Sequence, residues 1–248
     1  MSFYFKVINI RIKESRRHIM NEKNLFKNIN NKKIKELIDR MPNDIKKNCK
    51  VKKFDKGQIV VLKEDNIRFM YLHLEGQMKV RNEFENGFVY DFALIEPISY
   101  IGAMEIMANK DVYSSTLQAI TDSMIIEITK NDFIKWIEND HKLALDVLCF
   151  VSGNMYKQAL KTGEVLAYPA ICTLINYLIN VFESKNKKEV FIQKTREEIS
   201  SILGVSVRTI NRNLKILKEE NLLSVSRKGI LITEKQCEKL YEKLNSLK

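Results

Sequence analysis

The stretch that decides the fold of the C-terminal third runs Thr195-Arg-Glu-Glu-Ile-Ser-Ser-Ile-Leu-Gly-Val-Ser-Val-Arg-Thr-Ile-Asn-Arg-Asn-Leu-Lys-Ile-Leu217. Its first four residues form a capping box, because the Thr195 side chain can accept from the Glu198 N–H while Glu198 reaches back. Three apolar residues then form one side of a short helix: Ile199, Ile202 and Leu203. Gly204 ends this helix and Ser206 can cap the next one. Two short helices around a glycine turn predict a helix-turn-helix.

The second helix of this motif has two contrasting faces. Its apolar face consists of Ile210, Leu214 and Leu217. Its opposite face, at spacing i, i+3, i+4 and i+7, consists of Arg208, Asn211, Arg212 and Lys215. Arg can form two hydrogen bonds with guanine and Asn two with adenine, whereas Lys suits a phosphate. A solvated charged face is the alternative, but the flanking motif favours DNA.

The segment after these helices predicts a wing and a final helix. Two apolar runs, Leu222–Val225 and Ile230–Ile232, flank an Arg227-Lys228-Gly229 turn whose basic side chains could contact phosphate. A C-terminal helix is expected from near Thr233. Its inner face should consist of Cys237, Leu240, Tyr241 and Leu244.

The middle of the chain predicts an antiparallel β-sandwich or barrel. Between about Cys49 and Ile128, short alternating apolar runs are separated by Gly57, Gly76 and Gly87. Apolar residues at helical spacing predict a single helix over residues 24–47 before the strands.

A long helix is expected from Lys142 to Leu166. One apolar line steps by three or four residues, as in a coiled coil: Ala144, Leu148, Val151, Met155, Ala159 and Thr162. A second line, Leu143, Val147 and Phe150, covers a neighbouring face in the first half of the helix. The two lines are explained if one packs against the barrel and the other against a partner helix. The alternative is that both lines pack within the chain's own core.

Two segments raise the question of membranes or targeting. Val165–Phe182 carries no charge for 18 residues, the lower limit for a span, but Thr173, Asn176 and Asn180 form a polar stripe. A buried or half-buried helix of a soluble protein is therefore expected. The first 20 residues are no secretory signal, because charges interrupt their apolar run. These residues could form an extra strand or an ordered arm, or the protein could begin at Met20.

Charge and composition narrow the function class. Residues 1–53 hold 16 basic and 5 acidic residues, residues 54–169 hold 11 and 17, and residues 170–248 hold 15 and 9. Positive ends suit a polyanion such as DNA, although an AT-rich genome also enriches lysine. The chain has no Gly-rich phosphate loop, GxSxG or HExxH motif, so no enzyme is expected. Four scattered cysteines and three isolated histidines predict no catalytic residues, metal or cofactor.

The stretch from Thr195 to Leu217, continuing through Glu219-Glu-Asn-Leu-Leu223 to the wing, resembles the winged helix-turn-helix of the Crp/Fnr family of bacterial transcription regulators. Upstream, Lys56-Gly57, Leu74-Glu-Gly76 and Ile101-Gly102 resemble that family's cyclic-nucleotide-binding barrel. The resemblance covers about residues 45–245. It implies an α+β fold with an antiparallel β-barrel or jelly-roll sensor domain, a long dimerisation helix and a C-terminal winged helix-turn-helix.

The resemblance also implies roles for individual residues. A homodimer would present two recognition helices to a pseudo-palindromic promoter site in double-stranded DNA. The positions of Arg212 and Arg208 would read bases. Those of Arg196, Ser206 and Thr209 would contact phosphate. Val207 stands where several members carry a polar base reader, so the preferred DNA sequence should differ from theirs.

The barrel departs from the family where members bind cyclic nucleotides. Those members carry a Gly-Glu pair, whose Glu holds the ribose, and an Arg-Ser or Arg-Thr pair, whose Arg neutralises the phosphate. Here Gly102 is followed by Ala103, and Tyr113 precedes Ser114 at the arginine position. Glu105 is displaced by two residues, to the other side of a helix or the same side of a strand. A buried phosphate without its cation is costly, so these residues predict an effector pocket that does not respond to cyclic AMP.

These interpretations predict a cytoplasmic, dimeric, sequence-specific DNA-binding regulator. Its expected parts are an N-terminal extension (1–23), a barrel domain (24–140), a dimerisation helix and hinge (141–168) and a DNA-binding domain (169–248). RNA polymerase is a candidate partner, no membrane partner is expected, and the small-molecule effector is unknown. The alternative is a ligand-sensing module that acts mainly through protein contacts, which the acidic middle segment favours.

Overall fold

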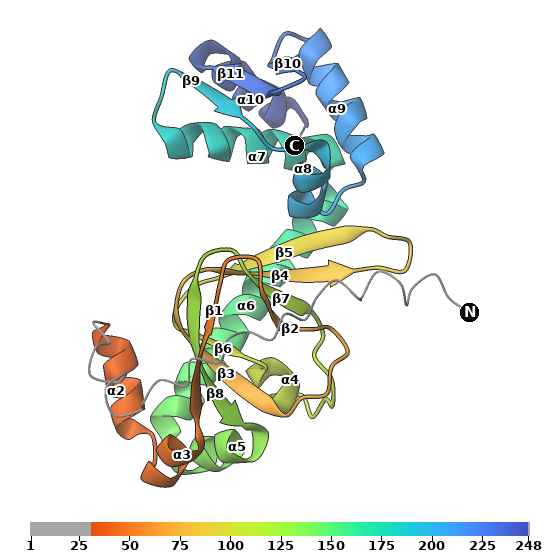
Figure 1. Cartoon of the computed structure of the whole chain (residues 1–248). Coiled ribbons are helices and arrows are strands. Elements are labelled where there is room, and N and C mark those ends of the chain that lie inside the picture. Colours follow the sequence, from red (N-terminus) through yellow and green to blue (C-terminus); the bar gives the residue numbers. More distant parts are fainter. Residues whose placement is uncertain (1–30, 248) are drawn as a thin grey trace. The chain divides into compact units, whose positions relative to one another are not determined.

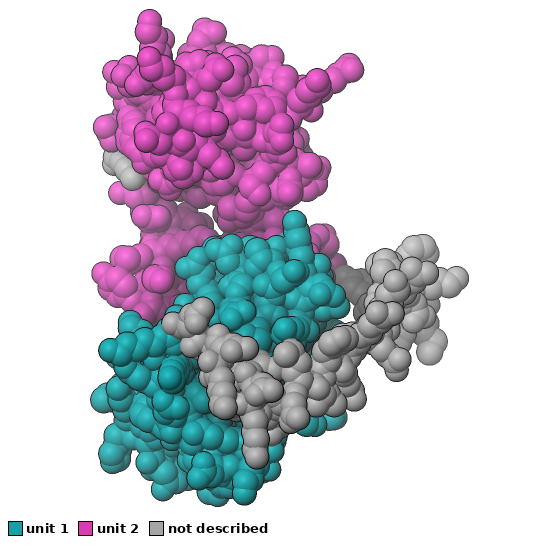
Figure 2. All heavy atoms as spheres, turned by 60° about the vertical axis from the view of Figure 1, so that its left-hand side comes forward, with its two compact units in different colours: residues 1–79, 94–151 teal, residues 80–93, 152–248 magenta. Residues whose placement is uncertain are grey.

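The computed structural model describes residues 31–247, and Figure 1 shows its elements in sequence colours. The chain divides into two compact units. One comprises residues up to 79 together with 94–151, and the other comprises residues 80–93 and 152–248 (Figure 2). The predicted N-terminal extension (1–23) lies outside the described residues.

Two short helices precede the strands, where the sequence pattern predicted one. They are α2 (Lys32–Arg40) and α3 (Asn43–Asn48), and the part of the expected helix before Asn31 lies outside the described residues. The prediction of a continuous helix was wrong because Pro42 is the N-cap of α3. Proline lacks the N–H that a helix interior needs and restricts the residue before it, so the chain turns at Met41. Met41 itself is buried.

Eight strands form two four-stranded sheets, which confirms the predicted antiparallel β-structure (Figure 1). The first sheet has the order β1-β8-β3-β6 and the second β2-β7-β4-β5. The strands are β1 (Lys50–Phe54), β2 (Ile59–Val61), β3 (Phe69–Glu75), β4 (Met78–Glu83), β5 (Val89–Ile95), β6 (Ser99–Ile101), β7 (Thr116–Ala119) and β8 (Ser123–Thr129). The central strands β3 and β8 supply the core, with Met70, Leu72, Ile125 and Ile126 fully buried.

Three helices accompany the sheets: α4 (Ala103–Met107), α5 (Lys130–Asn139) and the long α6 (His141–Ala167). The length of α6 confirms the predicted long helix. Its first turns pack through Leu143 and Val147, which are buried, and through Phe150, whose ring lies edge-on to Tyr100 at 5.7 Å. The second predicted apolar line therefore faces the chain's own first unit.

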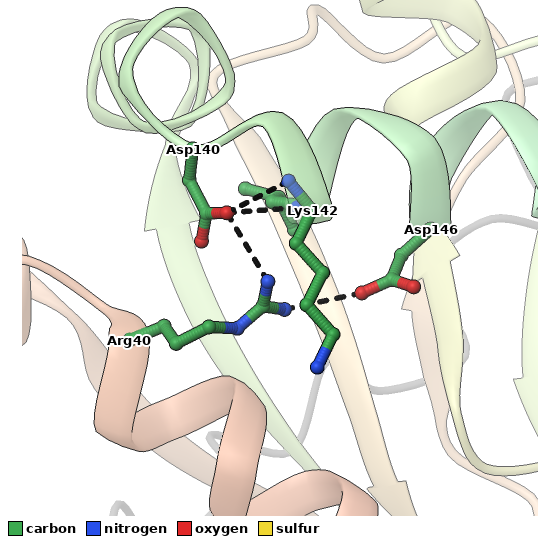
Figure 3. A network of polar contacts seen from close by, with 5 residues as sticks. Arg40, Asp140, Lys142 and Asp146 are labelled. Atoms are coloured by element: carbon green, nitrogen blue, oxygen red, sulfur yellow. Dashed lines mark hydrogen bonds and ion pairs between the residues drawn. The ribbon is translucent and has the colours of Figure 1, made fainter.

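A polar network fixes the beginning of α6 (Figure 3). The Asp140 Oδ1 atom accepts hydrogen bonds from the backbone N–H groups of Lys142 and Leu143, both at 3.0 Å, which caps the helix. The guanidinium of Arg40, at the end of α2, bridges Asp140 and Asp146 at 3.1 Å each. A residue a hundred positions earlier in the chain thus joins α2 to the first turns of α6.

The C-terminal part folds around one apolar core. Its elements are α7 (Ala170–Lys185), β9 (Glu189–Ile192), α8 (Arg196–Leu203), α9 (Val207–Glu219), β10 (Ser224–Ser226), β11 (Gly229–Thr233) and α10 (Glu234–Leu247). The strands form a sheet of order β10-β11-β9. Most of the uncharged stretch predicted as a buried helix lies in α7, whose Leu174, Ile175 and Leu178 are fully buried. Its first residues were predicted wrongly, because they end α6, where Leu166 is 82% exposed, and Pro169 separates the two helices. Within the part of the chain that the structure describes, no helix is long and apolar enough to cross a membrane.

The last helix, α10, packs on this core as expected, with one exception. Cys237, Leu240 and Leu244 are buried, whereas Tyr241 is 40% exposed. The prediction that Tyr241 belongs to the inner face was therefore wrong. Its hydroxyl donates to the Glu183 carboxylate of α7, so its polar end bonds at the surface.

Candidate DNA-binding surface and effector region

Local sequence signals build the turn between α8 and α9. The Glu198 N–H donates to Thr195 Oγ1 at 3.1 Å and the Thr195 N–H donates to Glu198 Oε2 at 2.7 Å, so the predicted capping box is present. Gly204 ends α8 in the left-handed region, at φ +69°, where glycine has no steric penalty. Ser206 then caps α9 by accepting from the Thr209 N–H at 3.2 Å. These caps fix the direction in which α9 leaves the turn.

Helix α9 has the two faces that its spacing predicted. Its apolar face is buried: Ile210, Leu214 and Leu217. Its polar face is exposed: Arg208, Asn211, Arg212 and Lys215. Lys215 makes an exposed ion pair with Glu219 at 3.8 Å, which contributes little to stability and leaves the ammonium available. Four donor-bearing side chains thus project from one rigid element.

Further donors surround this face. Ser206 is exposed, Thr209 is half-buried, and their hydroxyl oxygens lie 2.9 Å apart at the N-terminus of α9. Arg196, in the first turn of α8, is half-buried, and burial lowers the pKa of its guanidinium without removing its charge at neutral pH. Val207 is half-buried and offers no polar group to a base.

The predicted wing is the β10–β11 hairpin. Ser226 pairs with Gly229, so Arg227 and Lys228 form a two-residue turn and both are exposed. The Ser226 hydroxyl accepts from the Lys228 N–H at 3.2 Å and holds the turn closed. Two cationic side chains therefore project from the tip.

One buried residue of α9 was not predicted from the sequence. Asn213 is only 4% exposed and is buried on α9 together with Ile210, Leu214 and Leu217. Its Nδ2 atom has no hydrogen-bond partner among the described residues. The signal was present, since residue 213 falls at i+3 from Ile210 and four before Leu217, in the apolar register. The amide at this position matches neither the apolar pattern nor the charged pattern of the helix.

The predicted effector residues come together beside α4. Gly102 is the N-cap of this helix, in the left-handed region at φ +85°. Residues 103–107 form the helix α4, so Glu105, two positions after Ala103, lies on the other side of that helix from Ala103. Even so, Glu105 Oε1 accepts from the Ser114 hydroxyl at 2.6 Å and from the Ser114 N–H at 3.2 Å. The donors of Ser114 are thus already bound to a carboxylate of the chain.

Tyr113 fills the space beside Gly102. Its side chain is 5% exposed, and a Cβ on Gly102 would lie 3.1 Å from its ring. Its hydroxyl donates to the Phe69 carbonyl oxygen at 2.6 Å, and its ring stacks with Tyr71 at 6.5 Å. Burial raises the pKa of Tyr113 well above its usual value, so the side chain is neutral and is no counter-charge for a phosphate. Among residues 31–247, no group of three or more His, Cys, Asp or Glu residues could hold a metal ion.

Comparisons with known proteins match both parts. A cyclic nucleotide-binding domain model matches residues 51–140, and a Crp-like helix-turn-helix domain model matches residues 174–242. Together the two matches span more than half of the chain, in the order that the resemblance implied. The chain belongs to the Crp/Fnr family of transcription regulators. Within this family, it is a DNA-binding transcription regulator, and its matched relatives are transcription regulators.

Individual Crp/Fnr relatives are distant in sequence. The cAMP-activated global transcriptional regulator CRP of Salmonella typhimurium is 23% identical over 192 residues, which cover 74% of this chain and 90% of that protein. The HTH-type transcriptional regulator ArcR of Staphylococcus epidermidis is 25% identical over 197 residues, covering 76% and 84%.

Solved structures share the fold of this Crp/Fnr chain. The c-di-GMP responsive global regulator CLP of Xanthomonas campestris has a TM-score of 0.65 at 15% identity, covering 80% of this chain and 98% of that one. A CRP/FNR-family transcriptional regulator from Thermus thermophilus has a TM-score of 0.60 at 16% identity, covering 80% and 100%. These likenesses confirm the predicted α+β fold class.

Proposed function

We propose that this Crp/Fnr regulator is a cytoplasmic homodimer that binds a pseudo-palindromic promoter site and does not respond to cyclic AMP. The observation that carries the proposal is the exposed Arg–Asn–Arg–Lys face of α9, which is held rigidly by the caps on either side of its turn. RNA polymerase is the expected protein partner. The proposed parts are the barrel over residues 24–140, the dimerisation helix and hinge over 141–168, and the DNA-binding domain over 169–248.

In this proposal the candidate residues contact two different parts of the DNA, according to the chemistry of their side chains. Arg208, Asn211 and Arg212 read base edges in the major groove, where guanidinium and amide groups match guanine and adenine. Phosphate contacts set the register of the protein on DNA and carry no sequence information. Their candidates are Arg196, Ser206, Thr209, Lys215, Arg227 and Lys228. Val207 contributes apolar contact.

The DNA-binding proposal predicts a specific effect of Arg212→Ala. In gel shifts against promoter DNA with competitor, the wild-type protein should prefer one site, and Arg212→Ala should lose about 1–3 kcal/mol of that preference per half-site. Arg68→Ala, which removes an exposed arginine between β2 and β3, should bind like wild type. No preference of the wild-type protein for any site over random DNA would end this proposal.

Dimerisation is supported by the surface of α6. In this 27-residue helix the buried residues are Leu143 and Val147. Leu148 is 59% exposed and Met155 is 73% exposed, both on the predicted seam, and Leu160 is 55% exposed. A continuous apolar line on one helix is the pattern that coiled-coil pairing buries. A second copy of α6 is therefore the proposed partner.

The cyclic-nucleotide proposal rests on Glu105 and Tyr113. A cyclic phosphate at Ser114 would have to displace the Glu105 carboxylate and would meet neutral Tyr113 in place of a cation. Calorimetry of the full chain with cyclic AMP or cyclic GMP should therefore give no binding, and neither nucleotide should change DNA affinity in gel shifts. Glu105→Gln, which removes the competing charge, should remain unresponsive because the cation is still missing. Tight binding of either nucleotide by wild type would refute the proposal.

A further inference from the structure

A recess lies between the end of α6, the helix α7 and the end of α8, all within the second compact unit. Its volume is about 240 Å³, which is smaller than the pockets that hold drug-sized ligands and suits a molecule the size of an amino acid. On the α6 side it is lined by Lys161, Glu164, Val165 and Tyr168. These residues fall at i, i+3, i+4 and i+7, so they share one face of the helix.

The α7 side of the recess is formed by the polar stripe of that otherwise apolar helix. The stripe consists of Thr173, Asn176 and Asn180, and all three residues line the recess. Among the described residues, no protein group forms a hydrogen bond with any of these three side chains. Each amide offers two donors and one acceptor oxygen, so the stripe can bind an uncharged polar group of a ligand.

Two side chains of opposite charge stand on the α6 side of the recess. Lys161 is half-buried, and its Nζ atom lies 5.0 Å from the centroid of the Tyr90 ring, a contact that supplies no hydrogen-bond acceptor. Glu164 is exposed one turn further on, and it forms no ion pair with any residue that the structure describes. The rest of the lining is neutral, Tyr177 included, because burial raises the pKa of its hydroxyl. The recess therefore carries one positive and one negative charge.

This charge arrangement selects against ions of a single sign. A phosphate would meet the Glu164 carboxylate, and a simple cation would meet the Lys161 ammonium. A zwitterion that carries a carboxylate and an ammonium on neighbouring atoms can pair with both side chains through charge-assisted hydrogen bonds. An amide or hydroxyl on the same molecule would then match the polar stripe.

We propose that this recess binds a free α-amino acid with a polar, uncharged side chain. Its carboxylate pairs with Lys161, its ammonium with Glu164, and its side chain with Asn176 and Asn180. The site is separate from the effector region beside α4. It also leaves the proposed dimer seam free, because Lys161 and Glu164 lie about 100° and about 160° around α6 from Thr162, the last residue of that seam.

Ligand analogues test the proposal without any substitution. In calorimetry of the full chain, at least one of L-glutamine, L-asparagine, L-serine and L-threonine should bind. At ten times its dissociation constant it should raise the melting temperature by about 3 °C. The N-acetyl derivative of that amino acid lacks the ammonium and its carboxamide lacks the carboxylate, so each should bind at least about tenfold more weakly. The proposal fails if none of the four binds at concentrations up to about 10 mM, or if both derivatives bind as well as the parent compound.

Substitutions then locate the bound molecule. Lys161→Met keeps the apolar stem and removes the charge, so it should weaken binding about tenfold and abolish the preference for the free carboxylate over the carboxamide. Lys157→Met, one turn earlier at an exposed position outside the recess, is the matched control and should bind like wild type.

Two further variants cover the case in which Lys161→Met fails to fold. Glu164→Gln should abolish the preference for the free ammonium over the N-acetyl group, and Asn176→Leu should weaken binding of the parent amino acid about tenfold. Unchanged affinity and unchanged preferences in all the folded variants would place the ligand elsewhere and overturn the proposal. These measurements use no DNA, so their outcome is independent of the proposed DNA-binding function.

Discussion

His73 shows how a single buried group makes stability depend on pH. It is fully buried on β3, and its Nε2 atom lies 2.8 Å from the Glu75 carbonyl oxygen. Burial lowers the pKa of His73 below its ordinary value of 6.5, so the unfolded chain binds the proton more readily than the folded one. The free energy of unfolding should therefore fall as the pH drops below 6.5 towards the folded-state pKa. In urea titrations from pH 7.5 to about 5.5, His73→Gln should lose this component, whereas His141→Gln, at an exposed position, should keep it.

For single residues, the sequence predicted which side chains are exposed better than it predicted which groups they contact. The exposed face from Arg208 to Lys215 follows from helical spacing alone, and its roles in DNA contact stay predictions. The bond between Glu105 and Ser114 did not follow, because it joins side chains nine residues apart across a bend in the chain. The burial of Asn213 did follow from its position in the apolar register of α9, but its amide side chain does not mark an apolar face.

The contribution of the N-terminal cap of α8 to the stability of the protein can be tested by one substitution. Thr195→Ala removes the acceptor for the Glu198 N–H, and the loss of an N-cap should lower the free energy of unfolding by about 1 kcal/mol. Urea unfolding followed by circular dichroism measures this change. Thr173→Ala, on the polar stripe of α7, provides the matched control and should change stability by less than about 0.5 kcal/mol. Equal stabilities for the two variants would show that the capping box contributes nothing.

Elements with strong local signals were predictable, and pairings between distant segments were not. The long helix α6, the glycine turn after α8 and the β10–β11 hairpin each follow from spacing or turn residues within a few positions. The break at Pro42 was missed because the apolar periodicity continues through it. The order β1-β8-β3-β6 joins segments some seventy residues apart, and no local pattern contains that information.

The oligomeric state and the thermal stability of the protein should depend on protein concentration if two copies pair through α6. Met155→Lys puts a charge into the proposed seam, and it should raise the dimer dissociation constant by at least about tenfold because a charge is costly to bury. Asn154→Lys carries the same charge about 100° around the helix and should pair normally. Sedimentation at several protein concentrations measures the constant, and the wild-type melting temperature should rise with concentration. A wild-type protein that stays monomeric throughout would contradict the proposed dimer.

The four thiols of the chain differ in access. Cys49, Cys172 and Cys237 are buried, while Cys149 is exposed on α6, directly after Leu148. A maleimide dye should therefore attach to the native protein at one position, without engineered cysteines. Mixing donor- and acceptor-labelled molecules would then turn subunit exchange into an energy-transfer signal, readable in real time while DNA or candidate effectors are added.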